Sequence, residues 1–238
     1  NGELNFHEAL IARVALLSGL PESAIGEVLD SRITLAAGGR ELISVTDNGR
    51  GMAADELALA IERHATSKIR DDDDLTRILT LGFRGEALPS IAAVSRLTIT
   101  SRARDSAEAA QVTVDGGRKS AVRPAAMGAG TRVEVRDLFY ATPARLKFLK
   151  NDRTEAGHIL DHLRRLAMAH PEVAFTLIDD RRTPLRVARV PGDDGLLRRL
   201  EALLGPDFTA NAVEIAAERQ GLRQRADRTR LRHRRARD

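Results

Sequence analysis

The chain has 238 residues, which is enough for one large domain, or for one domain and part of another. It contains no cysteine, which excludes disulfides and thiolate metal sites. No apolar run approaches the roughly 18 residues of a membrane span, and the first residues do not resemble a signal peptide. We therefore expect a cytoplasmic protein that does not enter a membrane.

The net charge of +4 is unevenly distributed. Residues 219–238 hold nine Arg and two Asp, a net charge of +7, so the rest of the chain has a net charge of −3. The basic pI therefore belongs to the C-terminal segment, and it does not by itself predict a nucleic-acid-binding domain.

Hydrophobic spacing predicts helices and strands in an irregular alternation along the chain. The predicted helices cover residues 1–20, 21–31, 53–64, 73–79, 86–94, 154–169 and 196–204. The predicted strands cover residues 32–36, 41–46, 96–102, 111–115, 131–135, 173–178, 185–190 and 212–216. Runs of strands with helices between them favour an α+β, two-layer sandwich, in which a mixed β-sheet has helices on one face.

Composition divides the chain into three parts. Residues 1–192 form the predicted main domain, which ends at a turn-rich linker. Residues 193–223 look like the beginning of a second, incomplete domain. Residues 224–238 are rich in Arg and have no core-forming period, so they are predicted to be disordered.

The most informative stretch begins with Asp47-Asn48-Gly49-Arg50-Gly51. A partly buried carboxylate at the end of an apolar strand is a good acceptor for an exocyclic amine such as that of adenine. Gly49 and Gly51 would permit positive φ and let a flat ligand approach the backbone. The alternative is a type I′ hairpin turn, which Asp-Asn-Gly also favours, although a predicted helix follows directly.

Two further segments are suited to phosphates. Gly82 and Gly85 precede a predicted helix, whose first N–H groups can bind an anion, and Arg84 adds a cation. Thr66-Ser67-Lys68 offers hydroxyls and an ammonium, although a solvated loop is the better explanation of that string taken alone. Neither a P-loop nor a Rossmann glycine pattern is present.

Glu27 and Ser31 are four residues apart and would share one helix face. A carboxylate and a short oxygen ligand in that arrangement can polarise water and help to hold Mg²⁺. The spacing alone is weak evidence for either role.

Taken together, these strings resemble the ATP-binding domain of the MutL mismatch-repair proteins, which belong to the GHKL (Bergerat-fold) ATPases. The resemblance lies in Asp47 to Met52, His64 to Ile69, Leu81 to Leu88 and Asp137 to Arg145, and it extends from about Arg32 to Leu222. A gyrase-like GHKL chain should lack the Phe139-Tyr140-Ala141-Thr142-Pro143 string, so this second possibility ranks lower.

The resemblance implies ATP and Mg²⁺ as cofactors and Glu27 as the base that activates water. It places Asp47, Gly49, Gly51, Met52 and Thr131 around adenine. It also places Thr66, Ser67, Lys68, Gly82, Phe83, Arg84, Gly85 and Glu86 in a lid over the phosphates, and it makes the second domain ribosomal S5-like. Ser31 stands where the family has a Mg²⁺-binding Asn, unless Ser31 and Arg32 already belong to the next strand.

The resemblance also implies a role. The expected function is a weakly hydrolysing ATP-binding module of DNA mismatch repair, in which ATP orders the lid and drives homodimerisation. The expected partners are mismatch-recognition and strand-nicking proteins, and DNA bound weakly and without sequence specificity. Because the segment around Glu27 departs from the family pattern, the alternative is a hydrolysis-defective scaffold that acts as an interaction or DNA-binding module.

Overall fold

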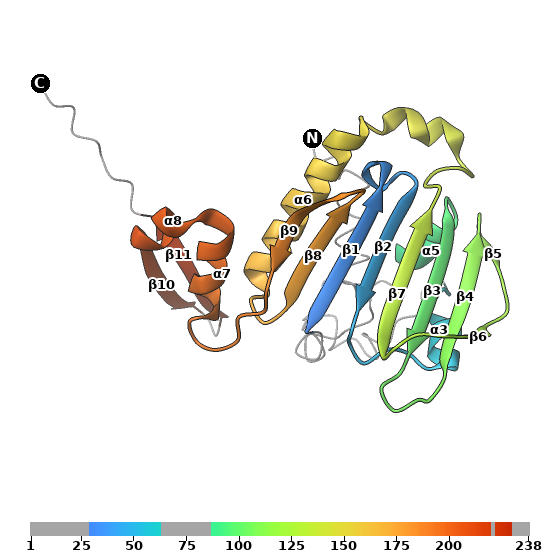
Figure 1. Ribbon diagram of the computed structural model, residues 1–238, viewed down its shortest axis with the longest axis horizontal. Coiled ribbons are helices and arrows are strands. Elements are labelled where there is room, and N and C mark those ends of the chain that lie inside the picture. Colours follow the sequence, from blue (N-terminus) through green and yellow to red (C-terminus); the bar gives the residue numbers. More distant parts are fainter. Residues whose placement is uncertain (1–28, 63–86, 220–221, 230–238) are drawn as a thin grey trace, which may run out of the picture.

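The computed structural model describes residues 29–62, 87–219 and 222–229 (Figure 1). From residue 213 onward it describes the backbone alone. The predicted helices over residues 1–20 and 73–79 lie outside the described residues, as does nearly all of the one predicted over residues 21–31.

A mixed sheet of nine strands forms the centre of the described structure (Figure 1). Its order is β5-β4-β3-β7-β2-β1-β8-β9, with β6 paired to β4. β1 and β8 run parallel, whereas the other pairs of this sheet are antiparallel. The strands are β1 (Asp30–Ala36), β2 (Leu42–Asp47), β3 (Arg96–Arg102), β4 (Ala109–Asp115), β5 (Arg118–Lys119), β6 (Arg123–Ala125), β7 (Gly130–Arg136), β8 (Ala174–Asp179) and β9 (Arg182–Val187).

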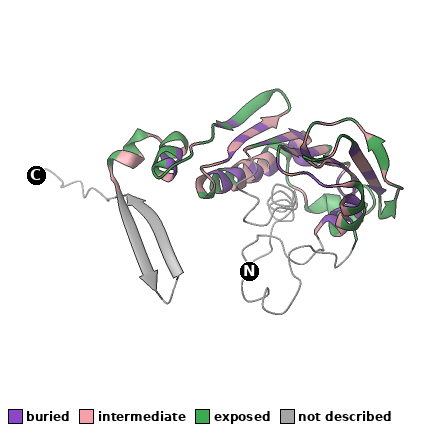
Figure 2. Cartoon of the chain, turned by 90° about the horizontal axis from the view of Figure 1, so that it is seen from below, coloured by how far each residue is buried: buried purple, intermediate pink, exposed green. Residues whose placement is uncertain are grey.

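The sheet is buried on one face only. Along β1, Ile33 and Leu35 are buried while Arg32 is exposed, and the same two-residue alternation runs through the neighbouring strands. Helices α3 (Ala54–Ala60), α5 (Ala87–Ala92) and α6 (Asp152–Ala169) contribute to the core on the buried face, and Figure 1 shows α3 and α5 behind the strands. Among the described residues, no helix lies against the opposite face, which is called the open face below (Figure 2).

These features confirm the predicted α+β sandwich. The strands over residues 96–102 and 131–135 and the helix over residues 154–169 lie within two residues of their predicted bounds. The short strands β5 and β6 and the 3₁₀ turns η1 (Ala37–Gly39) and η2 (Pro143–Phe148) were missed, because segments of two to six residues are too short to show a period.

Capping residues in the local sequence determine where helix α6 begins. Asn151 caps it by accepting a hydrogen bond from the Thr154 N–H at 2.9 Å, and the Glu155 carboxylate reaches back to the Lys150 N–H at 2.8 Å. The helix start packs on η1 so closely that a Cβ at Gly38 would lie 2.3 Å from the carbonyl oxygen of Asp152. The glycine therefore fixes the position of α6 over the sheet.

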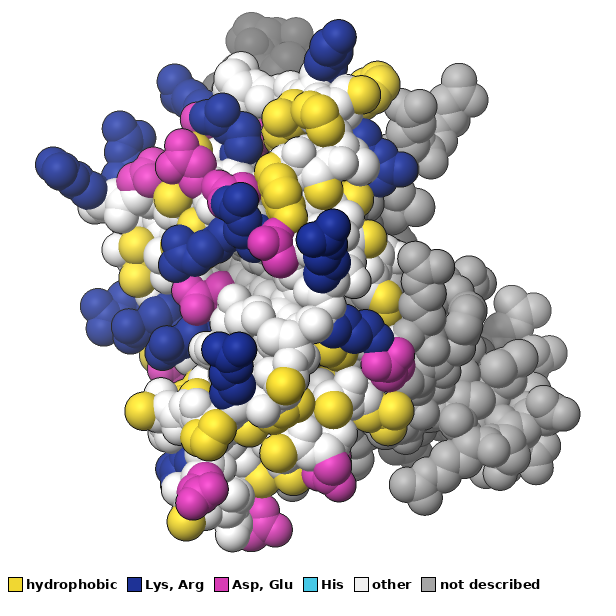
Figure 3. All heavy atoms as spheres, turned by 90° about the vertical axis from the view of Figure 1, so that its right-hand side faces the viewer, with side chains coloured by type: hydrophobic (Ala, Val, Ile, Leu, Met, Phe, Trp, Pro, Cys, Tyr) yellow, Lys and Arg dark blue, Asp and Glu magenta, His cyan; other side chains and the backbone are white. Residues whose placement is uncertain are grey.

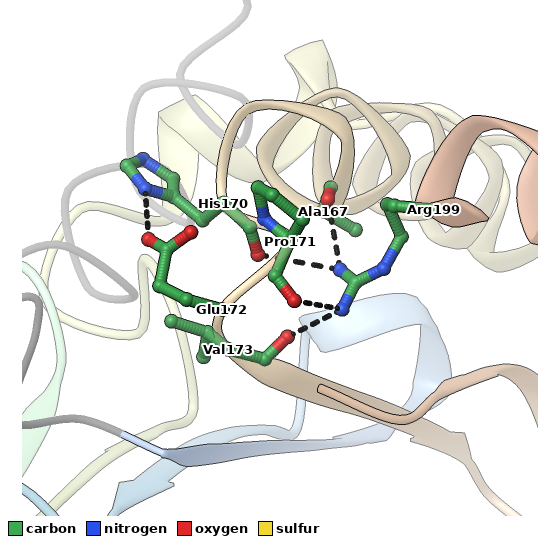
Figure 4. Close-up of polar contacts among 6 residues, drawn as sticks. All are labelled: Ala167, His170, Pro171, Glu172, Val173 and Arg199. Carbon is green, nitrogen blue, oxygen red and sulfur yellow. Dashed lines mark hydrogen bonds and ion pairs between the residues drawn. The ribbon is translucent and has the colours of Figure 1, made fainter. Parts of the chain in front are cut away.

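Helix α7 (Gly195–Leu204) is joined to this body by a fully buried arginine (Figure 4). The Arg199 guanidinium donates to five carbonyl oxygens at 2.8–3.3 Å, those of Ala167, His170, Pro171, Val173 and Ala188. Burial lowers the pKa of Arg199, and the charge of Glu172 opposes that shift. The predicted domain boundary at residue 192 thus falls before a helix that is bonded to the first domain.

Beyond α8 (Pro206–Ala210), β10 (Ala212–Arg219) and β11 (Leu222–Thr229) form an antiparallel pair. Composition predicted disorder from residue 224, whereas the structure pairs residues 224–229 with the preceding strand. A hairpin satisfies its backbone groups locally and does not require an apolar period in both strands. The last part of the Arg-rich segment, residues 230–238, lies outside the described residues.

Replacement of Arg199 should be strongly destabilising. Arg199→Met would leave five carbonyl oxygens, two of them in fully buried hydrogen bonds, without a charged donor, and we expect the free energy of unfolding to fall by about 3 kcal/mol. Arg198→Met, on the exposed side of the same helix, is the matched control and should change it by less than about 0.5 kcal/mol. Urea unfolding measures both, and equal effects would show that the cage does not hold α7.

Candidate functional site

A row of small polar side chains crosses the buried face near one end of the sheet. Ser31, Asp47, Thr131 and Ser101 lie on four adjacent strands and are paired in register. Each is at most 7% exposed, whereas the next inward positions along the same strands are apolar residues such as Ile33 and Val45. The polar row therefore marks the point where the hydrophobic core ends.

Asp47 is the last residue of β2, and its carboxylate Oδ1 accepts a hydrogen bond from the Gly49 N–H at 2.8 Å. The side chain of Asn48 contacts the start of β1 instead. Its oxygen accepts hydrogen bonds from the N–H groups of Leu29 and Asp30 at 2.9 and 3.0 Å. The next element is helix α3, not a partner strand. The hairpin alternative for this motif is therefore wrong.

Two glycines allow backbones to meet closely beside this row. Gly51 has φ +71°, and a Cβ there would lie 1.9 Å from the Arg102 carbonyl oxygen. Gly130 has φ +119°, and its Cβ would lie 2.1 Å from the Asp47 carbonyl oxygen. The expected positive φ is confirmed at Gly51 but not at Gly49, which is not among the glycines with positive φ. Any larger residue at Gly51 or Gly130 would displace the turn that carries Asp47.

Ser101 connects the row, and the sequence analysis missed it. Its Oγ accepts from the Met52 N–H at 2.8 Å, lies 2.9 Å from Thr131 Oγ1 and lies 3.0 Å from the carbonyl oxygen of Gly130. A hydroxyl has one proton, so with that proton donated to Gly130, Thr131 is the donor to Ser101. The available signal was a serine at an inward strand position that otherwise calls for an apolar residue.

The remaining predicted phosphate residues, Thr66, Ser67, Lys68, Gly82, Phe83, Arg84, Gly85 and Glu86, lie outside the described residues, as does Glu27. Ser31 is described and stands inside β1, paired with Asp47 on one side and with Phe175 on the other. Ser31 and Arg32 thus belong to the strand, as one of the two readings of the sequence held. In the described part of the chain no group of three or more His, Asp or Glu side chains is arranged to hold a metal ion.

The Asp137–Tyr140 string, which carries part of the family resemblance, is anchored to the far end of the sheet. Leu138 and Phe139 are buried, and both Asp137 and Phe139 have positive φ. The exposed Tyr140 hydroxyl donates to Asp115, and the Arg96 guanidinium lies 4.5 Å from the centre of the tyrosine ring. Arg96 also pairs with Asp137, so the string is tied to β3 and β4.

Comparison with known proteins gives a consistent result. The chain is 54% identical over 212 residues to the DNA mismatch repair protein MutL of Bradyrhizobium diazoefficiens, which covers 85% of this chain and 35% of that protein. It is 52% identical over 227 residues to MutL of Rhodopseudomonas palustris, covering 90% and 38%. The chain therefore spans about a third of the length of the curated relatives that it matches. No family model matches the chain.

Among solved structures, the ADP complex of the Aquifex aeolicus MutL ATPase domain matches with a TM-score of 0.65 and 28% identity. The match covers 92% of this chain and 76% of that one. A DNA repair protein's N-terminal domain matches with a TM-score of 0.62 at 20% identity, which supports the fold alone.

The one-sided mixed sheet, the polar row at its end and these structural matches define a GHKL-type ATPase domain. Within that class, the chain belongs to the MutL family of DNA mismatch repair proteins. Among the described residues, no helix is both long and apolar enough to cross a membrane.

Removal of the Ser101 hydroxyl should loosen the polar row. Ser101→Ala leaves the Met52 N–H and the Thr131 hydroxyl without their partner, and we expect a loss of about 1–3 kcal/mol in the free energy of unfolding. Thr98→Ala, on the open face of the same strand, is the matched control and should cost less. Thermal and urea unfolding provide the comparison, and a cost for Ser101→Ala no greater than the control's would contradict the linking role.

The hydrogen bond to Asp115 raises the pKa of Tyr140, the chain's single tyrosine, above its usual value near 10. Absorbance of the phenolate therefore reports this group alone. Because the folded pKa is the higher one, the bond's contribution to stability is complete below the unfolded pKa and is lost as pH rises through the folded pKa. Asp115→Asn should lower the pKa of Tyr140 in an ultraviolet titration, and an unchanged titration would show that this bond does not form.

Proposed function

We propose that this domain binds ATP and hydrolyses it slowly as the nucleotide-responsive module of a MutL-type mismatch repair protein. The observation that carries the proposal is the buried Asp47 carboxylate, fixed at a strand end beside two glycines at which backbones approach closely. The carboxylate acceptor and the close backbone approach at the two glycines fit a flat adenine ring with its exocyclic amine. The Aquifex aeolicus relative that matches the fold is described as complexed with ADP.

The Asp47 carboxylate already accepts from the Gly49 N–H and has a further partner in the chain, so a ligand would have to share it. An ionised carboxylate offers about four lone-pair sites. A bond from the exocyclic amine of adenine to this charged acceptor would select adenine over guanine, which presents a carbonyl oxygen at that position. Thr131 is paired with Asp47 on the neighbouring strand, and its hydroxyl is hydrogen-bonded to Ser101 on the strand beyond.

The residues that would bind the phosphates are assigned from the sequence pattern. Thr66, Ser67 and Lys68 and the Gly82–Glu86 segment would bind them, with Glu27 as the general base and Mg²⁺ as the phosphate-bound ion that neutralises charge. Ser31 is an unsuitable Mg²⁺ ligand, because it is 4% exposed within a strand and belongs to no cluster of ligands among the described residues. The ion would need other ligands.

The absence of a suitable Mg²⁺ ligand at Ser31 favours one alternative function. If no residue fills the role of the family's metal-binding Asn, the domain binds nucleotide without turning it over and acts as a scaffold. In either case the expected partners are mismatch-recognition and strand-nicking proteins and DNA, with ATP-dependent homodimerisation, as the family resemblance implies.

Nucleotide binding is tested by substitution of Asp47. Asp47→Asn keeps the side chain's size and removes a charged acceptor, and we expect affinity for a fluorescent ATP analogue to fall about 10- to 100-fold, as loss of a charge-assisted hydrogen bond predicts. Asp193→Asn, on the exposed segment before α7, is the control for the charge change and should bind normally. Absence of saturable binding by the unmodified domain, or equal binding by both variants, would contradict the proposal.

Hydrolysis is tested separately. Phosphate release with Mg²⁺ should be slow but measurable, and Glu27→Ala should reduce it to background while leaving analogue binding unchanged. If the unmodified domain and Glu27→Ala both bind the analogue and both release phosphate at background rates, the scaffold function is correct instead.

A further inference from the structure

The side chain of Asn48 connects the turn after β2 to the beginning of β1. Asn48 follows Asp47 directly, and its side-chain oxygen accepts hydrogen bonds from the N–H groups of Leu29 and Asp30 at 2.9 and 3.0 Å. These two donors are consecutive residues at the point where the chain enters β1. We call this pair of hydrogen bonds the Asn48 clasp.

The backbone of the same turn is fixed on its other side to the end of β3. The Arg104 N–H donates to the Arg50 carbonyl oxygen at 3.0 Å, and the Arg104 guanidinium donates to the Asn48 carbonyl oxygen at 3.2 Å. The Met52 N–H donates to Ser101 at 2.8 Å. The turn is thus attached to β3 by its backbone, and the clasp extends that attachment to β1.

The clasp begins where the pairing of β1 with β2 ends. Ser31 and Asp47 are the last paired residues of these two strands, so Leu29 and Asp30 lie beyond the ladder on that side. On the other side, the Ala174 N–H donates to the Leu29 carbonyl oxygen at 3.0 Å. An amide oxygen accepts hydrogen bonds as a backbone carbonyl does, so the Asn48 side chain takes the place of the missing strand partner.

Covalent geometry links this segment to the proposed general base. Glu27 stands two residues before Leu29 in the sequence. Two residues of chain span at most about 7 Å, so the Cα of Glu27 cannot lie further than that from the Cα of Leu29. The clasp therefore holds the segment through which Glu27 is connected to the sheet.

We propose that Asn48 is a positioning residue for ATP hydrolysis. The clasp keeps the entry of β1 at a fixed distance from the turn that carries Asp47, and so relates the base to the adenine site. A general base must come within hydrogen-bond reach of the water that it deprotonates, and a displacement of about 1 Å can slow a reaction about 100-fold. The inference rests on the proposed function, because it requires Glu27 to act on a nucleotide bound at Asp47.

A contribution to stability does not account for the clasp. Both hydrogen bonds are exposed to solvent, so water can replace the Asn48 oxygen at little cost. The surroundings do not favour an anionic ligand either. The turn lies at the lower end of the sheet in Figure 1, and in Figure 3 Asp, Glu and hydrophobic side chains predominate along that end of the visible face. The clasp contributes a fixed geometry between two segments that are 18 and 19 residues apart.

Formation of the clasp is tested by hydrogen–deuterium exchange of the full chain without nucleotide. Asn48→Ala removes the acceptor, and the amides of Leu29 and Asp30 should exchange at least about tenfold faster. Asn48→Asp keeps an oxygen at that position, and its charge strengthens the hydrogen bonds, so exchange should stay slow. Unchanged exchange in Asn48→Ala would overturn the inference.

Asn151→Ala is the matched control. The Asn151 side-chain oxygen also accepts two hydrogen bonds at 2.9 and 3.0 Å, both from Thr154 at the start of α6. Its removal should therefore cost similar stability, while exchange at Leu29 and Asp30 stays as in the unmodified chain.

Positioning is tested by separating turnover from nucleotide affinity. With saturating ATP and Mg²⁺, we expect Asn48→Ala to lower kcat for phosphate release at least about tenfold. Affinity for the fluorescent ATP analogue should change by less than about threefold, because Asp47 is retained. Asn48→Asp should recover most of the turnover, and Asn151→Ala should match the unmodified chain in both measurements. Partial unfolding would lower turnover and the number of binding sites together, so it would not give this division.

The other outcomes separate this inference from the proposed function. If Glu27→Ala abolishes turnover and Asn48→Ala does not lower it, hydrolysis stands and the positioning role is wrong. If Asn48→Ala weakens analogue binding as much as Asp47→Asn and keeps kcat, Asn48 belongs to the adenine site instead. Failure of Asn48→Asp to recover turnover would show that the acceptor is not what matters. Background phosphate release by the unmodified chain would remove both the hydrolytic function and this inference.

Discussion

One-sided burial of the mixed sheet is the constraint on which the position of the candidate site depends. Successive residues of a strand point to opposite faces, so the same strands deliver Asp47 and Thr131 to the core side and Arg32 and Arg132 to the open side. A slip of one residue in register would exchange the two sets. The apolar residues Ile33 and Val45 prevent that slip, because it would expose them to water. Packing of the core therefore specifies where charge is placed on each face.

Close backbone approach brings the residues of the candidate site together. Gly51 against β3 and Gly130 against β2 draw the strand ends together, and Ser101 then satisfies the Met52 N–H and the Thr131 hydroxyl inside that small space. A buried polar group without a partner is costly, so each of these hydroxyls must be placed accurately. The need for partners also applies to Arg199, whose burial is tolerated because five carbonyl oxygens surround its guanidinium. That cage connects α7 to the end of α6, to the end of β9 and to the segment before β8.

Only part of the strings that carry the family resemblance lies in the described part of the chain. Asp47, Gly51 and Met52 converge at one strand end with Thr131, as the family resemblance implied. Ser31 lies in the same row, as a strand residue paired with Asp47.

The sequence by itself determined the alternation of helices and strands, the α+β class and the family. Hydrophobic period and glycine-rich strings are local properties, and both can be read without knowing which segments touch. It also singled out Asp47 correctly as a carboxylate at the end of a strand. Tertiary structure decided the strand order, the choice of helix over hairpin after Gly51, the link through Ser101 and the pairing of residues 224–229. These depend on contacts between segments far apart in the chain or on backbone pairing that composition does not reveal, and local residue patterns carry no record of either.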